Sequence, residues 1–160
     1  KIFLLLPCFL AKILFMSPFV EKRFFPKQKV NHDEKKRLTA VVKKHLLEKP
    51  AIAFAYIHGS FVTAESFRDI DVAIYTSESR DFQYESDLSY ELSAATGYDV
   101  EVRIINNAAV AFQSGAIESG KLLFSRNETL RTDFIEDVGR RYIEYAHFRN
   151  IFMEAVSAKQ

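Results

Sequence analysis

Cysteine and an excess of either charge are what this 160-residue sequence has least of. Its single cysteine, Cys8, can form no internal disulfide, which fits a reducing, cytoplasmic setting. The 22 lysines and arginines nearly balance the 21 aspartates and glutamates, for a net charge of +1. This balance argues against a strongly basic nucleic-acid binder, so we expect no direct nucleic-acid partner, although a local basic patch stays open. With 48% hydrophobic and 27% charged residues, the composition is that of one globular domain.

A clean membrane-spanning run is also missing. Residues 2–20 are strongly apolar, but Pro7, Lys12 and Pro18 interrupt them, whereas a span needs roughly 20 apolar residues. The run could be a secretory signal, although no small-x-small cleavage site follows it, or a poor membrane anchor. We favour a third interpretation, in which translation starts at Met16. We therefore separate residues 1–30, an apolar segment and linker, from a domain over 31–160, and we expect no membrane association for the folded domain.

From residue 31 onward, helical patterns alternate with short apolar segments. An apolar stripe predicts a first helix over 33–48, capped by Asn31 or Asp33. The segment 51–57 is apolar on both faces, which favours a central strand. The further expected elements are strands 69–75, 98–105 and 121–124 and helices 82–96, 108–119 and 127–157. This order predicts an α/β (α+β) fold with helices flanking a mixed central sheet of about four strands, and a C-terminal helical segment.

The C-terminal segment 127–157 has a long apolar pattern at helical spacing. A break near Gly139 would divide it into two helices. We expect its apolar side chains to be mostly core, while an exposed remainder could form a partner surface. These side chains are Leu130, Phe134, Ile135, Val138, Tyr142, Tyr145, Phe148, Ile151 and Phe152.

Two aspartates mark the strand 69–75. Asp69 and Asp71 are two residues apart, so their carboxylates share one face, with Cα atoms roughly 6.5–7 Å apart. The other face is wholly apolar and belongs in the core, so the acidic face lines either solvent or a site. Close carboxylates repel, and Mg²⁺ is the natural cation to relieve that repulsion because it prefers oxygen ligands. A pair of ordinary surface acids is the alternative.

Strand 98–105 repeats the arrangement, with Asp99, Glu101 and Arg103 on one face. If this strand lies beside 69–75, Glu101 or Asp99 can join the two aspartates. Three carboxylates suit a two-metal site, in which the ions lie about 3.5–4 Å apart. For Arg103, a salt bridge to the neighbouring carboxylates competes with phosphate binding.

Gly59 and Ser60 directly follow the apolar strand 51–57. Glycine lets the backbone approach phosphates closely, amides in such a turn can form a nest for anions, and the Ser60 hydroxyl can add a hydrogen bond. A Gly-Ser pair alone is a weak signal, but a paired-aspartate strand a few residues later strengthens it. His58, just before the turn, is expected to be packed rather than catalytic.

The segment HGSFVTAESFRDIDVAIY resembles the signature of polymerase β-type nucleotidyltransferases, in which Gly-Ser, a spacer and Asp-x-Asp on a strand follow one another. The sequence is most similar to the minimal nucleotidyltransferases. Many of these are antitoxins paired with a HEPN-domain ribonuclease toxin. VEVRIIN resembles the third-carboxylate strand of that group, and SGKLLFSRN resembles its following strand. The resemblance covers about residues 35–155.

This resemblance implies specific roles for the residues that match. Two Mg²⁺ ions would be bound by Asp69, Asp71 and Glu101, and the same acids would be catalytic, with Glu101 or Asp71 helping to deprotonate the incoming hydroxyl. The triphosphate of ATP would be held by Gly59 and Ser60, with Arg68 and Arg103 as further nucleotide-binding candidates.

The implied reaction transfers AMP from ATP to a tyrosine hydroxyl of the partner toxin and silences it. Three departures from the family pattern bear on this: the eight-residue spacer between Ser60 and Asp69 is short, it lacks a glycine, and Arg68 stands where serine is usual. They leave open a binding module that neutralises a partner by contact. A transferase acting on an aminoglycoside-like small molecule is a third alternative, which the absence of an additional substrate domain disfavours.

Overall fold

The computed structural model describes residues 26–158, and its centre is a four-stranded sheet with the strand order β5-β4-β2-β6. β4 (Ile70–Thr76) and β5 (Val100–Ile104) are parallel, whereas β2 (Ile52–His58) is antiparallel to β4 and to β6 (Lys121–Ser125). A separate ribbon pairs β1 (Gln28–Lys29) with β3 (Ser66–Phe67). The helices are α2 (His32–Leu47), α3 (Ser60–Thr63), α4 (Phe82–Thr96), α5 (Val110–Glu118) and α6 (Glu128–Ser157).

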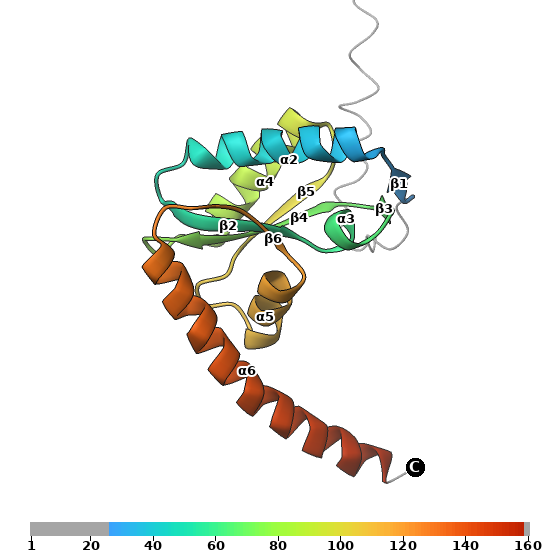
Figure 1. Ribbon diagram of the computed structural model, residues 1–160, viewed down its shortest axis with the longest axis vertical. Helices are drawn as coiled ribbons and strands as arrows, with labels where there is room; N and C mark the ends of the chain where they lie inside the picture. The colour runs from blue at the N-terminus through green and yellow to red at the C-terminus, as the bar shows by residue number, and fades with distance from the viewer. Residues whose placement is uncertain (1–25, 159–160) are drawn as a thin grey trace, which may run out of the picture.

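Helices cover both faces of the central sheet (Figure 1). α2 and α4 lie over one face, while α5 and the first part of α6 lie over the other. This architecture of a mixed four-stranded sheet flanked by helices, with a C-terminal helix, confirms the predicted fold class.

The core beneath α2 and α4 follows from the apolar spacing of the elements. Leu38, Val42 and Leu46 recur every fourth residue on α2 and are fully buried. They pack with Leu88 and Leu92 of α4 against alternate strand residues, which include Ile57, Ile70, Val72, Ile74, Val100 and Val102. The apolar faces predicted for β4 and β5 are therefore both in this core.

A second core lies between the sheet and the pair α5 and α6. Phe54 and Ala73 of the sheet are fully buried there against Phe134 and Val138 of α6. Because β2 contributes to both cores, it is the doubly covered strand that its sequence predicts. The face of β4 that carries Asp71 was expected to line solvent or a site, yet its Ala73 is buried. The open part of this face is therefore limited to the beginning of the strand.

Several predicted boundaries agree closely with the structure. α2 begins one residue earlier than predicted, and its N-cap is Asn31, whose side chain accepts the Glu34 amide at 2.8 Å. α4 spans the predicted residues and ends at Gly97, whose φ of +78° is the left-handed conformation that favours glycine.

The predicted break in the C-terminal helix is wrong, because α6 is continuous from Glu128 to Ser157. A glycine costs a helix only about 1 kcal/mol relative to alanine, and packing of Val138 on one side of Gly139 outweighs that cost. Ion pairs from Arg140 and Arg141 to Asp137 also bridge the position. The expectation that the apolar residues of this segment are mostly core fails beyond residue 142, where Tyr145, Phe148, Ile151 and Phe152 are exposed.

The structure tests only part of what the sequence predicts for the N-terminal segment. Residues 1–25 lie outside the described residues, and the domain division at residue 31 stays a prediction. Within the predicted linker, residues 28 and 29 form β1. No helix in the described range 26–158 is long and apolar enough to cross a membrane.

Helix α4 also supplies hydrogen-bond acceptors to the outer side of β5. The amides of Val100, Val102 and Ile104 donate to side chains of Ser93, Ser89 and Glu85 at 2.9, 2.9 and 2.7 Å. These three side chains are spaced by four residues, so they share one face of α4. The contacts fix α4 along β5 and so help to hold β5 in register beside β4.

Candidate active site

Parallel pairing of β4 and β5 places the predicted acidic residues side by side. Asp71 is the register partner of Glu101. Asp69 precedes Asp71 by two residues, so its side chain projects toward the same face. One carboxylate oxygen from each of Asp69, Asp71 and Glu101 lies within 4.8 Å of the other two, and all three residues are partly exposed. These three residues are called the carboxylate cluster below.

Asp99, the alternative third acid, is placed differently. It is exposed and precedes β5, and its backbone carbonyl accepts the Ile70 amide at 2.9 Å. Among the described residues, the group that could hold a metal contains Glu101 and not Asp99. The geometry therefore favours Glu101, while its role as a metal ligand stays a prediction.

The turn after β2 touches the carboxylate cluster through Gly59. This residue has φ +71° and ψ −159°, a conformation that is nearly reserved for glycine. A Cβ atom at position 59 would lie 2.1 Å from Oδ2 of Asp71. Glycine is therefore required here both for its backbone angles and for the close approach of the Asp71 carboxylate. The turn and the cluster form one structural unit.

Lys35 of α2 holds the segment that follows this turn. Its ammonium group donates to the carbonyl oxygens of Phe61 and Ala64, at 2.7 Å each, and lies 5.4 Å from the Phe61 ring centroid. These carbonyls belong to α3 and to the residue after it, so Lys35 fixes the one-turn helix that Ser60 begins. The sequence analysis did not identify Lys35, because contacts across 26 and 29 residues leave no local signal.

His58 lies beside the cluster in a largely buried position. Its backbone is the register partner of Asp71, and its ring centroid is 5.6 Å from that of Phe112 on α5. Nε2 is buried and has no hydrogen-bond partner within residues 26–158. Burial lowers the pKa of His58, and the negative charge of Glu101 partly opposes this shift. The imidazole is thus a neutral, packed group at neutral pH, in line with the sequence-based expectation.

The two predicted arginines occupy different environments. Nη2 of Arg103 lies 2.7 Å from Oε1 of Glu101, which is the salt bridge considered from the sequence, and the Arg103 side chain is 51% exposed. Arg68 directly precedes Asp69 and is half-buried. Nucleotide binding by either arginine stays a prediction.

The donor set of the carboxylate cluster fits Mg²⁺. This ion takes oxygen ligands and usually keeps positions for water and for substrate phosphates, which partly exposed carboxylates allow. A hollow of about 500 Å³ at the opposite ends of β4 and β5 is also lined by acids, but among the described residues they form no group close enough to hold a metal. Two of its polar side chains are already engaged, because Glu85 accepts the Ile104 amide and Asn106 bonds to the backbone of Thr76.

The sequence profile described as "Polymerase beta, Nucleotidyltransferase" matches residues 41–129. The matched region is more than half of the chain, and it contains the Gly59 turn and the carboxylate cluster. The chain therefore belongs to the polymerase beta nucleotidyltransferase family, which confirms the resemblance drawn from the motif.

Solved structures with the same fold include toxin–antitoxin complexes. A chain in the complex of a tri-AMPylated Shewanella oneidensis HEPN toxin with MNT antitoxin has a TM-score of 0.62 and 18% identity, over 74% of this chain and 98% of that one. A chain of the MntA-HepT toxin–antitoxin crystal structure has a TM-score of 0.60 and 17% identity, over 79% of this chain and 98% of that one. A chain of a toxin–antitoxin structure with AMP-PNP has a TM-score of 0.61 and 19% identity, over 79% of this chain and 98% of that one. No curated protein sequence gives a significant match.

Proposed function

We propose that this protein transfers AMP from ATP to a hydroxyl group of a partner protein, a tyrosine of a HEPN-type toxin, and thereby acts as an antitoxin. The observation that carries the proposal is the meeting of Asp69, Asp71 and Glu101 beside a glycine turn that touches Asp71. Similar structures support it, since one contains an AMPylated HEPN toxin and another AMP-PNP. One such complex carries two aspartate-to-glutamate substitutions two positions apart, the spacing of Asp69 and Asp71.

Asp69, Asp71 and Glu101 would hold two Mg²⁺ ions, which supply positive charge that stabilises the negative charge developing on the phosphates. The turn formed by Gly59 and Ser60 would bind the triphosphate through backbone amides and the Ser60 hydroxyl. Half-buried Arg68 and exposed Arg103 would add positive charge at the edge of the nucleotide. Lys35, through the carbonyls that it holds, would keep Ser60 in place.

In the proposed reaction, the tyrosine oxygen attacks the α-phosphorus of ATP. A bond forms between these two atoms, the bond from the α-phosphorus to the bridging oxygen breaks, and pyrophosphate leaves. The hydroxyl proton passes to Glu101 or Asp71, the partly exposed carboxylates of adjacent strands. Orientation of the acceptor next to these groups supplies much of the rate enhancement.

Contact without catalysis is the second candidate function, and the short spacer between Ser60 and Asp69 favours it. These eight residues include all of α3 except Ser60 and the whole of β3, and they are anchored by the buried rings of Phe61 and Phe67. In this case the domain would neutralise its partner by binding alone. For either function we infer a cytoplasmic setting, in keeping with the single cysteine of the sequence.

The proposal is tested by incubating the purified protein with Mg²⁺, ATP and the HEPN-type protein encoded beside it, followed by intact-mass measurement of that protein. We expect added AMP with the wild type and a loss of at least about 100-fold in rate with Asp69→Asn, Asp71→Asn, because the cation ligands are removed. Excess EDTA should abolish the transfer. Asp99→Asn is the matched control, since it removes an acid outside the cluster, and its rate should stay within about twofold.

No AMP on the partner in the presence of folded wild type would reject the enzymatic proposal. If the double variant still protects cells from the partner as well as the wild type does, contact alone is the function. Equal losses in the double variant and in Asp99→Asn would show that general charge near β5, rather than the cluster, matters.

A further inference from the structure

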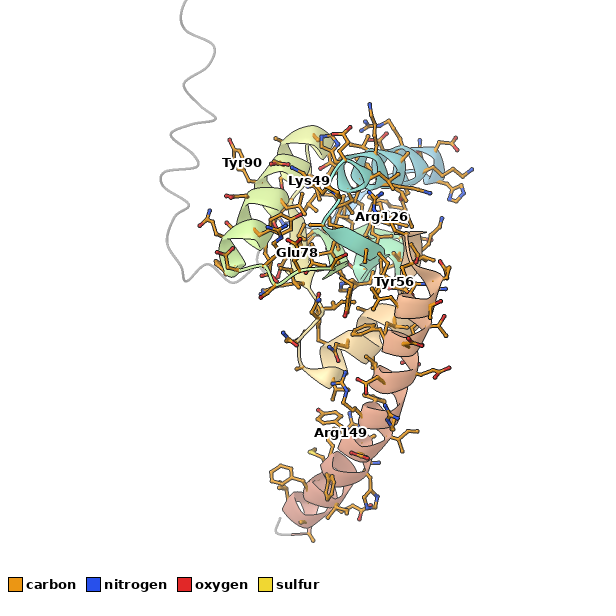
Figure 2. All side chains as sticks on the ribbon, turned by 90° about the vertical axis from the view of Figure 1, so that its left-hand side faces the viewer. Lys49, Tyr56, Glu78, Tyr90, Arg126 and Arg149 are labelled. Carbon is orange, nitrogen blue, oxygen red and sulfur yellow. The ribbon has the colours of Figure 1, made fainter. Side chains whose placement is uncertain are left out.

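The distal half of α6, residues 143–157, presents an apolar stripe. Tyr145, Phe148, Phe152 and Val156 are spaced by three or four residues and so lie along one face of the helix. They are 39%, 69%, 64% and 42% exposed. These four residues are called the distal stripe below. In both views, this half of α6 extends beyond α5 and the sheet (Figures 1 and 2), and the label of Arg149 marks it in Figure 2.

The distal stripe continues a face that is buried in the proximal half, residues 128–142. Phe134 and Val138 lie at the same angular position around the helix, four residues apart, and are 9% and 2% exposed in the second core. The same face of one helix is therefore core where α5 and the sheet reach it and open to solvent where they end. This change from buried to exposed along one apolar helix face indicates that the distal stripe is an interaction surface.

The stripe belongs to the side of the sheet on which the carboxylate cluster opens. Asp71 and Ala73 are two residues apart on β4, so their side chains point to the same face. Ala73 is buried in the core formed with α5 and α6. A molecule seated against the distal stripe would therefore lie on the face from which an acceptor reaches the cluster.

The area of the stripe favours a different protein over a second copy. With roughly 200 Å² for each large side chain, the exposed fractions amount to roughly 400 Å² of apolar surface. Two such stripes would bury roughly 800 Å² of apolar surface, about the apolar share of the smallest stable interfaces, so the stripe alone would give at most a marginal dimer. A different protein that contacts the stripe and also the region of the active site has no such limit.

Charge and shape argue against a second copy as well. In an antiparallel pair of distal halves, Arg149 lies near the middle of the overlap and meets its own counterpart, and like charges at an interface oppose association. In a parallel pair, each domain would occupy the space needed by the other, because the proximal half of the same face is already covered by its own domain.

We propose that the distal stripe is the surface on which the modified protein partner docks. This proposal rests on the proposed function and names the recognition element for that acceptor. The occupant is an amphipathic helical face whose aliphatic residues pack on Phe148 and Phe152, as in helix–helix packing. This partner helix carries an acidic side chain opposite Arg149. Within the described residues, Arg149 makes a weak hydrogen bond of 3.4 Å to the side-chain oxygen of Asn150.

The test compares two surfaces of the same helix. Phe148→Glu, Phe152→Glu changes the distal stripe, while Ile143→Glu changes an apolar residue that is 72% exposed on the opposite side and serves as the matched control. Affinity for the HEPN-type protein encoded beside this chain is measured by calorimetry. We expect the double variant to bind at least about 100-fold more weakly, as for central aromatic anchors, and the control to change by less than about threefold.

Further measurements separate docking from catalysis. Binding of Mg²⁺-ATP, titrated in the same preparations, should be equal in all three proteins, because the stripe lies outside the site. Arg149→Glu should weaken partner binding about tenfold at low salt and less at high salt. If the glutamate variants lose helix content by circular dichroism, Phe148→Gln, Phe152→Gln keeps good helix formers at both positions and replaces them.

Equal affinity of wild type and double variant for the partner overturns the docking proposal, as does a wild type that does not bind the partner at all. A wild type that forms a dimer which the double variant disrupts also overturns it, in favour of a second copy. If the wild type binds the partner through the stripe but transfers no AMP, docking stands and the proposed enzymatic function fails.

Discussion

The two halves of α6 have the same apolar spacing but different surroundings. In the proximal half, Phe134 packs against Phe54 and Tyr75, with ring centroids 5.7 and 5.1 Å apart. In the distal half, Phe152 is 64% exposed. The difference teaches that periodicity in a sequence identifies a helical face but not what covers that face.

The lengths of α5 and α6 explain where the apolar face of α6 changes from buried to exposed. α6 has 30 residues and is therefore about 45 Å long, whereas α5 has nine residues and is about 14 Å long. α5 and the sheet can cover only the first part of the longer helix. The remainder keeps the same pattern because another molecule, in our proposal, takes the place of α5.

Truncating one aromatic residue in each half of α6 tests the difference between the two halves most directly. Phe134→Ala should lower the free energy of unfolding by about 3–5 kcal/mol, because it removes a buried ring and leaves a cavity. Phe152→Ala should change it by less than about 0.5 kcal/mol, since the ring has little to lose on unfolding. Urea denaturation of both variants provides the measurement. Equal destabilisation would mean that the distal half packs against the domain in solution.

A smaller effect is expected at the junction between the halves. Arg141 donates to the side-chain oxygen of Gln113 at 2.9 Å, and Gln113 is fully buried. Arg141→Met should destabilise the protein by about 1–3 kcal/mol, because that oxygen loses its partner. Arg140→Met is the control: Arg140 shares the ion pair with Asp137 but is exposed, so a change below about 0.5 kcal/mol is expected.

The pH dependence of the same two variants separates the two contacts of Arg141. Hydrogen bonds from Arg140 and Arg141 lower the pKa of Asp137 from its ordinary value of 3.8. Stability from these bonds is therefore present above that pH and is lost as the pH falls through the lowered pKa. The amide of Gln113 does not titrate, so most of the Arg141→Met effect should persist in acid. Disappearance of the effect in acid would assign it to the ion pair instead.

The smallest expected effect is a gain in stability at Gly139. This glycine is exposed inside a continuous helix, and an added Cβ would meet no atom within 4 Å. Gly139→Ala should therefore raise the free energy of unfolding by about 0.5–1 kcal/mol, because it restricts the unfolded chain and favours the helix. Thermal unfolding followed by circular dichroism measures it. A loss of stability would indicate that the helix bends or breaks at residue 139 in solution.

Local patterns predicted much of the fold, for physical reasons visible in single elements. The stripe of Leu38, Val42 and Leu46 and the left-handed stop at Gly97 define their helices without reference to the rest of the chain. The alternation of β4 and β5 indicated which acids share a face. The sequence could group Glu101 or Asp99 with Asp71 only on the condition that the two strands are neighbours, and the parallel register seen in the structure makes Glu101 the partner of Asp71.

Contacts between distant segments could not be predicted in this way. The approach of Gly59 to Asp71 depends on the pairing of β2 with β4, and the hold of Lys35 on Phe61 depends on the path of α2. The helix break was wrongly predicted because the penalty for Gly139 is a local quantity, whereas the packing of Val138 is not. The exposure of Phe148 was missed for the same reason.

The hydrogen bonds from β5 to Glu85, Ser89 and Ser93 have a consequence for self-assembly. β5 is an outer strand of the sheet, and an outer strand with unused amides is a template on which another chain can add in cross-β fashion. Because α4 side chains occupy those donors, strand addition along this border would first have to displace three hydrogen bonds. These three hydrogen bonds thus protect the β5 edge of the sheet against amyloid-like strand addition.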